Sequence, residues 1–93
     1  MVNSYKLEIS GKVQGVWYRD WFSKEAKKLK ITGYIKNLEN PNIVEALIQG
    51  DLRSINRLIF IAKIGPPLSK VKNINKKEIK LKKKFDVFLI KSL

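Results

Sequence analysis

The chain contains no histidine and no cysteine among its 93 residues. Without cysteine it can form neither a disulfide framework nor a thiol nucleophile. Without histidine it lacks the usual general base at neutral pH and the commonest transition-metal ligand. The 8 acidic residues are scattered, so no carboxylate cluster suited to Mg²⁺ or to glycoside hydrolysis is predicted. An enzyme of this composition has to work with arginine, amides and backbone N–H groups.

Long apolar runs are also missing. No run approaches the roughly 20 residues needed to cross a bilayer, and the first residues lack the basic-then-apolar pattern of a secretory signal. The length suits a single domain over residues 1–93, and a hydrophobic fraction of 44% is ordinary for a folded protein. We therefore expect a soluble, cytoplasmic monomer with no membrane partner.

The balance of charge is strongly positive. Lys and Arg number 20 against 8 Asp and Glu, a formal net charge of +12. The stretch from Lys63 to Lys91 is especially rich in lysine. Such a charge attracts phosphate esters, nucleic acid or acidic membrane surfaces at long range. A lysine-rich surface can equally serve solubility alone, so the charge does not select a partner.

Hydrophobic periodicity predicts alternating strands and helices. Helical spacing of apolar residues follows Asp20, and again follows Asp51, which suits a helix N-cap. The sequence Gly-Pro-Pro at residues 65–67 is expected to end the second helix. Period-2 or short apolar stretches predict strands around residues 5–9, 34–38, 43–49, 71–81 and 85–90.

This order, β-α-β-β-α-β with a possible short fifth strand, predicts an α+β fold. Two crossovers of the same hand around a central hairpin give the ferredoxin-like sandwich. We expect one antiparallel sheet with both helices on one face and the other face open to solvent. Because this fold supports many unrelated functions, function has to be inferred from a site.

The stretch GKVQGVWYRD, residues 11–20, joins the first strand to the first helix. A loop in this position can turn successive N–H groups inward, beside the helix N-terminus, and so bind an anion. Gly11 and Gly15 permit the sharp bends, and Arg19 can present its planar fork to two phosphate oxygens. The alternative is a plain glycine turn followed by a surface arginine.

Residues 11–19, GKVQGVWYR, resemble the signature of the acylphosphatase family, Gly-x-Val-Gln-Gly-Val-x-aromatic-Arg. Residues 33–37, GYIKN, are similar to that family's second motif, Gly-aromatic-aliphatic-basic-Asn. Val-Glu-Ala at residues 44–46 and Gly-Pro-Pro at residues 65–67 follow in the order expected of the family. The turn at residues 39–42 departs from the Asp-Gly type common there. The family fold is the ferredoxin-like sandwich.

The resemblance implies hydrolysis of acyl phosphates to a carboxylate and inorganic phosphate, with no metal, other cofactor or covalent enzyme intermediate. It implies that Arg19 and Asn37 are the catalytic residues, with Asn37 holding the attacking water. Phosphate is expected to bind the backbone N–H groups of the loop together with the Arg19 guanidinium. The residues concerned are Gln14, Gly15, Val16, Trp17, Tyr18 and Arg19.

Three side chains of the loop keep alternative roles. Gln14 either contacts the ligand or only shapes the loop. Of Trp17 and Tyr18, one is expected to pack beneath the loop and the other to line the pocket for the acyl group.

Inorganic phosphate, as the product, is expected to compete with the substrate for the same loop.

Two other functions fit parts of the sequence. A nucleic-acid-binding module would use the same fold and the high charge, but the aromatic residues do not form the patterns typical of RNA-recognition sheets. Nucleic acid is therefore expected to bind weakly and without specificity, if it binds. A domain that handles carbamoyl phosphate inside a larger protein is the third possibility, and the short chain favours a stand-alone enzyme.

Overall fold

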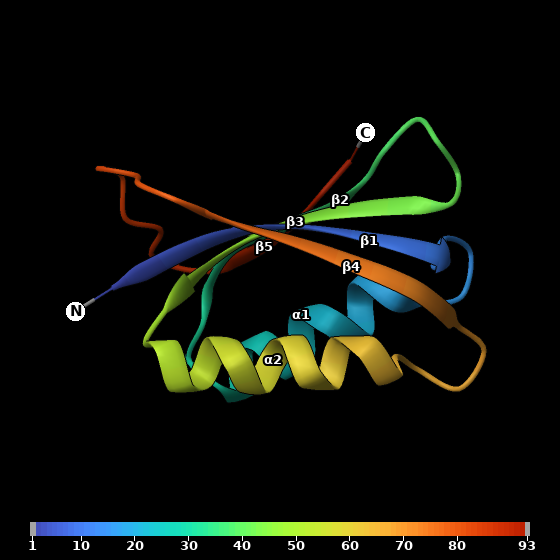
Figure 1. Cartoon of the computed structure of the whole chain (residues 1–93), viewed down its shortest axis with the longest axis horizontal. Coiled ribbons are helices and arrows are strands. Elements are labelled where there is room, and N and C mark those ends of the chain that lie inside the picture. Colours follow the sequence, from blue (N-terminus) through green and yellow to red (C-terminus); the bar gives the residue numbers. More distant parts are fainter. Residues whose placement is uncertain (1, 93) are drawn as a thin grey trace.

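The computed structural model describes residues 2–92 as a sheet covered on one face by two helices (Figure 1). The predicted order of elements is confirmed, and the fifth strand is present. Both helices lie against the same face, as expected of a ferredoxin-like fold. In chain order the elements are β1 (Asn3–Lys12), α1 (Tyr18–Lys28), β2 (Thr32–Asn37), β3 (Ile43–Gly50), α2 (Leu52–Ile64), β4 (Lys70–Ile79) and β5 (Phe88–Lys91).

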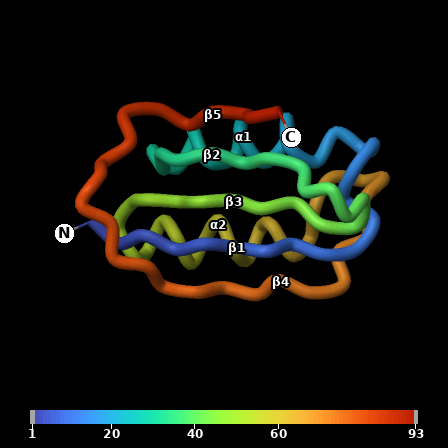
Figure 2. Tube along the Cα trace, turned by 90° about the horizontal axis from the view of Figure 1, so that it is seen from above, coloured from blue at the N-terminus to red at the C-terminus, as the bar shows by residue number. Residues whose placement is uncertain are grey.

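The strands are ordered β4-β1-β3-β2-β5 across the sheet, as Figure 2 shows. The first four strands pair antiparallel, but β5 pairs parallel with β2, so the sheet is mixed rather than wholly antiparallel. The reason lies in the connection after β4. It crosses the end of the sheet where β2 begins, and β5 then runs alongside β2 in the same direction.

Local signals explain where the second helix begins and ends. The Asp51 carboxylate caps α2 by accepting a hydrogen bond of 2.9 Å from the backbone N–H of Ser54. Gly65 ends the helix with a positive φ of 69°, which suits glycine, and two prolines follow. The first helix begins two residues before the predicted Asp20, because Tyr18 and Arg19 already have helical geometry.

The core lies between the sheet and the helices. Along β1, Leu7 and Ile9 point toward the helices and are fully buried, whereas Lys6 and Glu8 point to the opposite face. The same alternation in β3 places Val44, Ala46 and Ile48 in the core. Aromatic side chains of α1 and β5 complete it through the contact of Phe22 with Phe88, whose ring centroids are 5.7 Å apart. Within residues 2–92, no helix is long and apolar enough to cross a membrane.

Candidate active site

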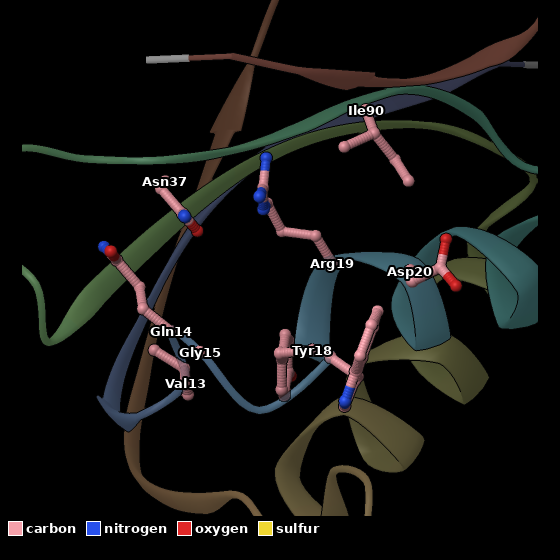
Figure 3. A pocket seen from close by; sticks show the side chains of 9 residues that line it. Val13, Gln14, Gly15, Tyr18, Arg19, Asp20, Asn37 and Ile90 are labelled. Atoms are coloured by element: carbon pink, nitrogen blue, oxygen red, sulfur yellow. The ribbon is translucent and has the colours of Figure 1, made fainter.

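The loop between β1 and α1 forms one wall of a cavity of about 450 Å³. The opposite side is contributed by the end of β2 and by β5, which lie beside α1 (Figure 3). The cavity therefore lies where three segments distant in sequence meet. Its lining residues are Val13, Gln14, Gly15, Trp17, Tyr18, Arg19, Asp20, Asn37 and Ile90.

The loop conformation depends on two left-handed residues. Gly15 has φ 73°, and a Cβ added there would meet no atom within 4 Å, so glycine is favoured there by the backbone angle rather than by lack of space. Trp17 has φ 65° although it carries a large side chain, and it immediately precedes α1. No side chain of residues 2–92 caps this helix start. The first N–H groups of α1 are thus left without a side-chain acceptor, beside the cavity.

Three side chains fix the loop to the core. Val13 and Val16 are buried, and so is Tyr18. The Tyr18 hydroxyl donates a hydrogen bond of 2.7 Å to the Ala62 carbonyl of α2. Burial raises the pKa of Tyr18 well above its ordinary value, so this hydroxyl stays a donor at all physiological pH values. The loop is therefore rigidly attached at both ends.

Arg19 extends from the first turn of α1 toward the sheet, with Asn37 on one side and Ile90 on the other (Figure 3). Its Nη1 donates a hydrogen bond of 3.2 Å to the carbonyl of Lys91 in β5. A guanidinium has five N–H donors, so this contact orients the group and leaves other donors free for a ligand. The parallel strand β5 thus has a direct part in building the site.

Asn37 lies at the last position of β2 and faces the cavity. Its side-chain Oδ1 is buried and has no hydrogen-bond partner among the described residues. Because an unpaired buried acceptor is costly, such an atom in a cavity favours a ligand or water that donates to it. The amide NH₂ of the same side chain can donate in turn to a second oxygen.

Gln14 joins the loop to the β2–β3 turn. Its Nε2 lies 2.9 Å from the carbonyl oxygen of Ile43, 3.0 Å from that of Asn40 and 3.1 Å from that of Leu38. Gly11, near the end of β1, donates its N–H to the Asn42 carbonyl over 2.9 Å. The loop and the turn that follows Asn37 are consequently held as one unit.

The sequence-predicted residues converge on this cavity with one exception. Val16 does not line it, because its side chain is buried in the core, so only its backbone amide is left for a ligand. Of the two aromatic residues, Tyr18 packs beneath the loop and Trp17 is the exposed one. Gln14 shapes the loop, which is one of the two roles predicted for it, but its partners in the β2–β3 turn were not anticipated. The contribution of Ile90 to the cavity was not anticipated either. The apolar Ile90 at the end of the last predicted strand was only a weak indication that it lines the site. Nothing in the sequence indicated that this strand pairs with β2.

Comparison with known proteins agrees with this geometry. The acylphosphatase family model matches residues 5–90. The chain belongs to the acylphosphatase family. An acylphosphatase of Thiobacillus denitrificans is 39% identical over 72 residues, which cover 77% of this chain and 80% of that protein.

Solved structures of the family have the same fold. The structure of an acylphosphatase from Coxiella burnetii superposes with a TM-score of 0.91 at 34% identity, covering 97% of this chain and 93% of that one. The acylphosphatase from Bacillus subtilis superposes with a TM-score of 0.90 at 32% identity, covering 97% and 98% of the two chains. The family match over residues 5–90 includes both the loop and the strand that ends at Asn37.

Proposed function

We propose that this chain hydrolyses acyl phosphates to a carboxylate and inorganic phosphate in the cavity between the loop and β2. The observation that carries the proposal is the convergence of Arg19 and the unpartnered Oδ1 of Asn37 on one cavity. Family membership supports the same chemistry. The proposed steps use no thiol or imidazole, and the chain has neither.

The phosphoryl group binds to the backbone N–H groups of residues 14–19 and to the Arg19 guanidinium. A phosphoryl group carries its charge on three oxygens, and a planar fork can contact two of them at once. The backbone groups are fixed in advance by the loop anchors, so they need little reorganisation when charge develops in the transition state. Phosphate binding in this loop also makes inorganic phosphate a competitive inhibitor.

Asn37 positions the attacking water. The water donates one hydrogen to Oδ1 and directs its lone pair at phosphorus, opposite the acyl oxygen. As the new P–O bond forms, the bond between phosphorus and the acyl oxygen breaks, and its electron pair leaves with the carboxylate. The remaining water proton passes to a non-bridging phosphate oxygen. A carboxylate leaves readily, so positioning and charge neutralisation suffice without a strong general base.

The apolar rim of the cavity receives the acyl group. Trp17 is 77% exposed and Ile90 is 43% exposed, and both line the cavity. Two exposed apolar side chains in the same cavity as the Arg19 guanidinium suit a substrate that joins an apolar acyl chain to a phosphate. The proposal also takes the protein to be a cytoplasmic monomer. Sedimentation of the purified chain and cell fractionation test these two points.

Release of inorganic phosphate from benzoyl phosphate and acetyl phosphate tests the activity directly. The wild-type chain is expected to turn over both, with inhibition by added inorganic phosphate. A purified, folded chain that released no phosphate from either substrate above the spontaneous rate would refute the proposed function.

A further inference from the structure

Among residues 2–92, no helix packs on the face of the sheet opposite α1 and α2, and the connection before β5 covers only one end of it (Figure 1). Strand alternation places on it the side chains of Lys6 and Tyr34, with their cross-strand neighbours. The connection before β5 adds Lys83 and Phe85, since Phe85 packs on Tyr34. We refer to this surface as the basic aromatic face: Lys6, Tyr34, Lys36, Lys77, Lys83, Phe85 and Lys91.

Both aromatic rings of this face are held in place. The Phe85 N–H donates a hydrogen bond of 2.8 Å to Oε1 of Gln49, and Gln49 Nε2 donates one of 2.7 Å to the Lys83 carbonyl. The Tyr34 hydroxyl donates over 3.0 Å to the Glu45 carboxylate. The two ring centroids are 6.2 Å apart with the planes at 71°. Each ring is half-buried, so part of it remains open to a ligand.

Cations surround these rings. The Lys91 ammonium lies 4.2 Å from the centroid of Tyr34, and the Lys83 ammonium lies 5.1 Å from that of Phe85. Lys77, the cross-strand neighbour of Lys6, adds another charge. Within the described part of the chain, Lys77, Lys83 and Lys91 form no salt bridge, so their charges are not neutralised by the protein.

The acidic groups on this face offset only part of that charge. Glu45 is nearly buried and lies 3.3 Å from the Lys6 ammonium and 3.7 Å from that of Lys36. Its cross-strand neighbour Glu8 is exposed. The surface is therefore positive on balance, with two fixed rings toward its β2–β5 side.

We propose that the basic aromatic face binds single-stranded nucleic acid without sequence specificity. The ammonium groups contact phosphates, and unstacked bases lie against the rings of Tyr34 and Phe85, while the Lys83 and Lys91 ammonium groups move from the rings to the phosphates. Stacking tolerates any base, because every base has a π-face. The sequence suggested only weak attraction by charge. It did not show that residue 85 is brought against residue 34.

This binding is separate from the proposed hydrolysis. Asn37 and Ile35 point toward the helices, whereas Tyr34 and Lys36 point to the uncovered face. The two sites thus lie on opposite sides of the sheet. Arg19→Ala is expected to abolish most hydrolysis and to leave nucleic-acid binding unchanged, so one proposal can fail without the other.

Fluorescence anisotropy with a labelled oligo(dT) of about 16 nucleotides, free of terminal phosphates, measures the binding. The wild-type chain is expected to bind it at about 150 mM salt. An abasic oligonucleotide of equal length and charge is expected to bind at least about tenfold more weakly, because it cannot stack. Absence of binding, or equal affinity for the two probes, would overturn the proposal in favour of charge alone.

Matched variants locate the binding on this face. Phe85→Leu is expected to weaken oligo(dT) binding about tenfold, and Phe60→Leu, which alters an exposed ring on α2, is expected to leave it unchanged. Lys77→Ala is expected to reduce the slope of log affinity against log salt by about 0.7, more than Lys63→Ala on α2. If the members of each pair behaved alike, the proposed surface would be wrong.

Discussion

The side-chain Nε2 of Gln14 lies 2.9 Å from the carbonyl oxygen of Ile43, the first residue of β3. This contact joins the loop that carries the phosphate-binding groups to the hairpin that carries Asn37. Two more carbonyls of the same turn lie within 3.1 Å of that nitrogen. In the proposed reaction phosphate and water sit on opposite sides of this junction. Gln14 is therefore a positioning residue, which sets the distance between them.

Replacement of Gln14 by alanine is expected to destabilise the fold by about 1–2 kcal/mol, because the turn carbonyls lose their shared donor. Urea unfolding measures this loss. The same variant is expected to lower kcat more than it weakens inhibition by phosphate, since the loop survives while Asn37 shifts. Gln14→Glu places a carboxylate against three carbonyl oxygens, so it is expected to destabilise the fold at least as much as Gln14→Ala. A Gln14→Ala protein with wild-type stability and kcat would remove this role.

Replacement of Arg19 by alanine is expected to lower kcat/KM for benzoyl phosphate by roughly 100-fold or more, because a charge-assisted contact to the transition state is lost. Arg19→Lys retains the charge but not the fork, and is expected to recover only part of the rate. The measurement is steady-state phosphate release. Arg53→Ala alters an exposed arginine on α2, so it serves as the control and is expected to match the wild type. Equal rates for Arg19→Ala and Arg53→Ala would contradict the assignment.

Replacement of Asn37 by alanine separates the water site from the phosphate site. We expect kcat to fall at least about tenfold while the inhibition constant of inorganic phosphate changes little, because the water loses its acceptor and the loop is untouched. Asn56→Ala on α2 provides a control of the same chemistry at an exposed position. If the Asn37 variant lost phosphate affinity and kept its turnover number, Asn37 would be a binding residue instead.

Glu45 is expected to make stability depend on pH in the acid range. Burial acts to raise the pKa of Glu45, but hydrogen bonds from Tyr34 and Lys6 and the positive charges of Lys6 and Lys36 together outweigh it, so the pKa lies below its ordinary value. The unfolded chain therefore takes up this proton first. The stabilisation is complete above the ordinary pKa of 4.5 and is lost as the pH falls from there through the folded-state pKa.

The unfolding free energy of the wild type is thus expected to fall between about pH 5 and pH 3 more steeply than that of Glu45→Gln. Urea unfolding at several pH values gives the comparison. Glu8→Gln alters the exposed neighbour on β1 and should keep the wild-type pH dependence. Parallel curves for the wild type and Glu45→Gln would show that the contacts of Glu45 do not lower its pKa.

Periodicity and turn chemistry predicted most of this fold, because each element carries its own local signal. Asp51 and Gly65 mark the ends of α2, and alternation marks β1 and β3. The parallel pairing of β5 with β2 was not predictable in this way. It depends on where the connection from β4 to β5, residues 80–87, crosses the sheet. No local sequence signal in this connection sets that position.

The site was predictable to the extent that its residues are contiguous or lie in a second recognisable motif. The loop and Asn37 met that condition. The role of Gln14 did not, because its partners are backbone carbonyls of residues 38, 40 and 43, which any side chains could accompany. The contact of Arg19 with the Lys91 carbonyl was not predictable for the same reason, because its partner is also a backbone carbonyl.

Hydrolysis in ¹⁸O-labelled water, followed by mass spectrometry of both products, tests the central claim most directly. Attack on phosphorus by a water held at Asn37 predicts that the label enters inorganic phosphate and that the carboxylate stays unlabelled. Label in the carboxylate would mean that water attacks the acyl carbon. That result would contradict the proposed placement of phosphate in the loop and of water at Asn37.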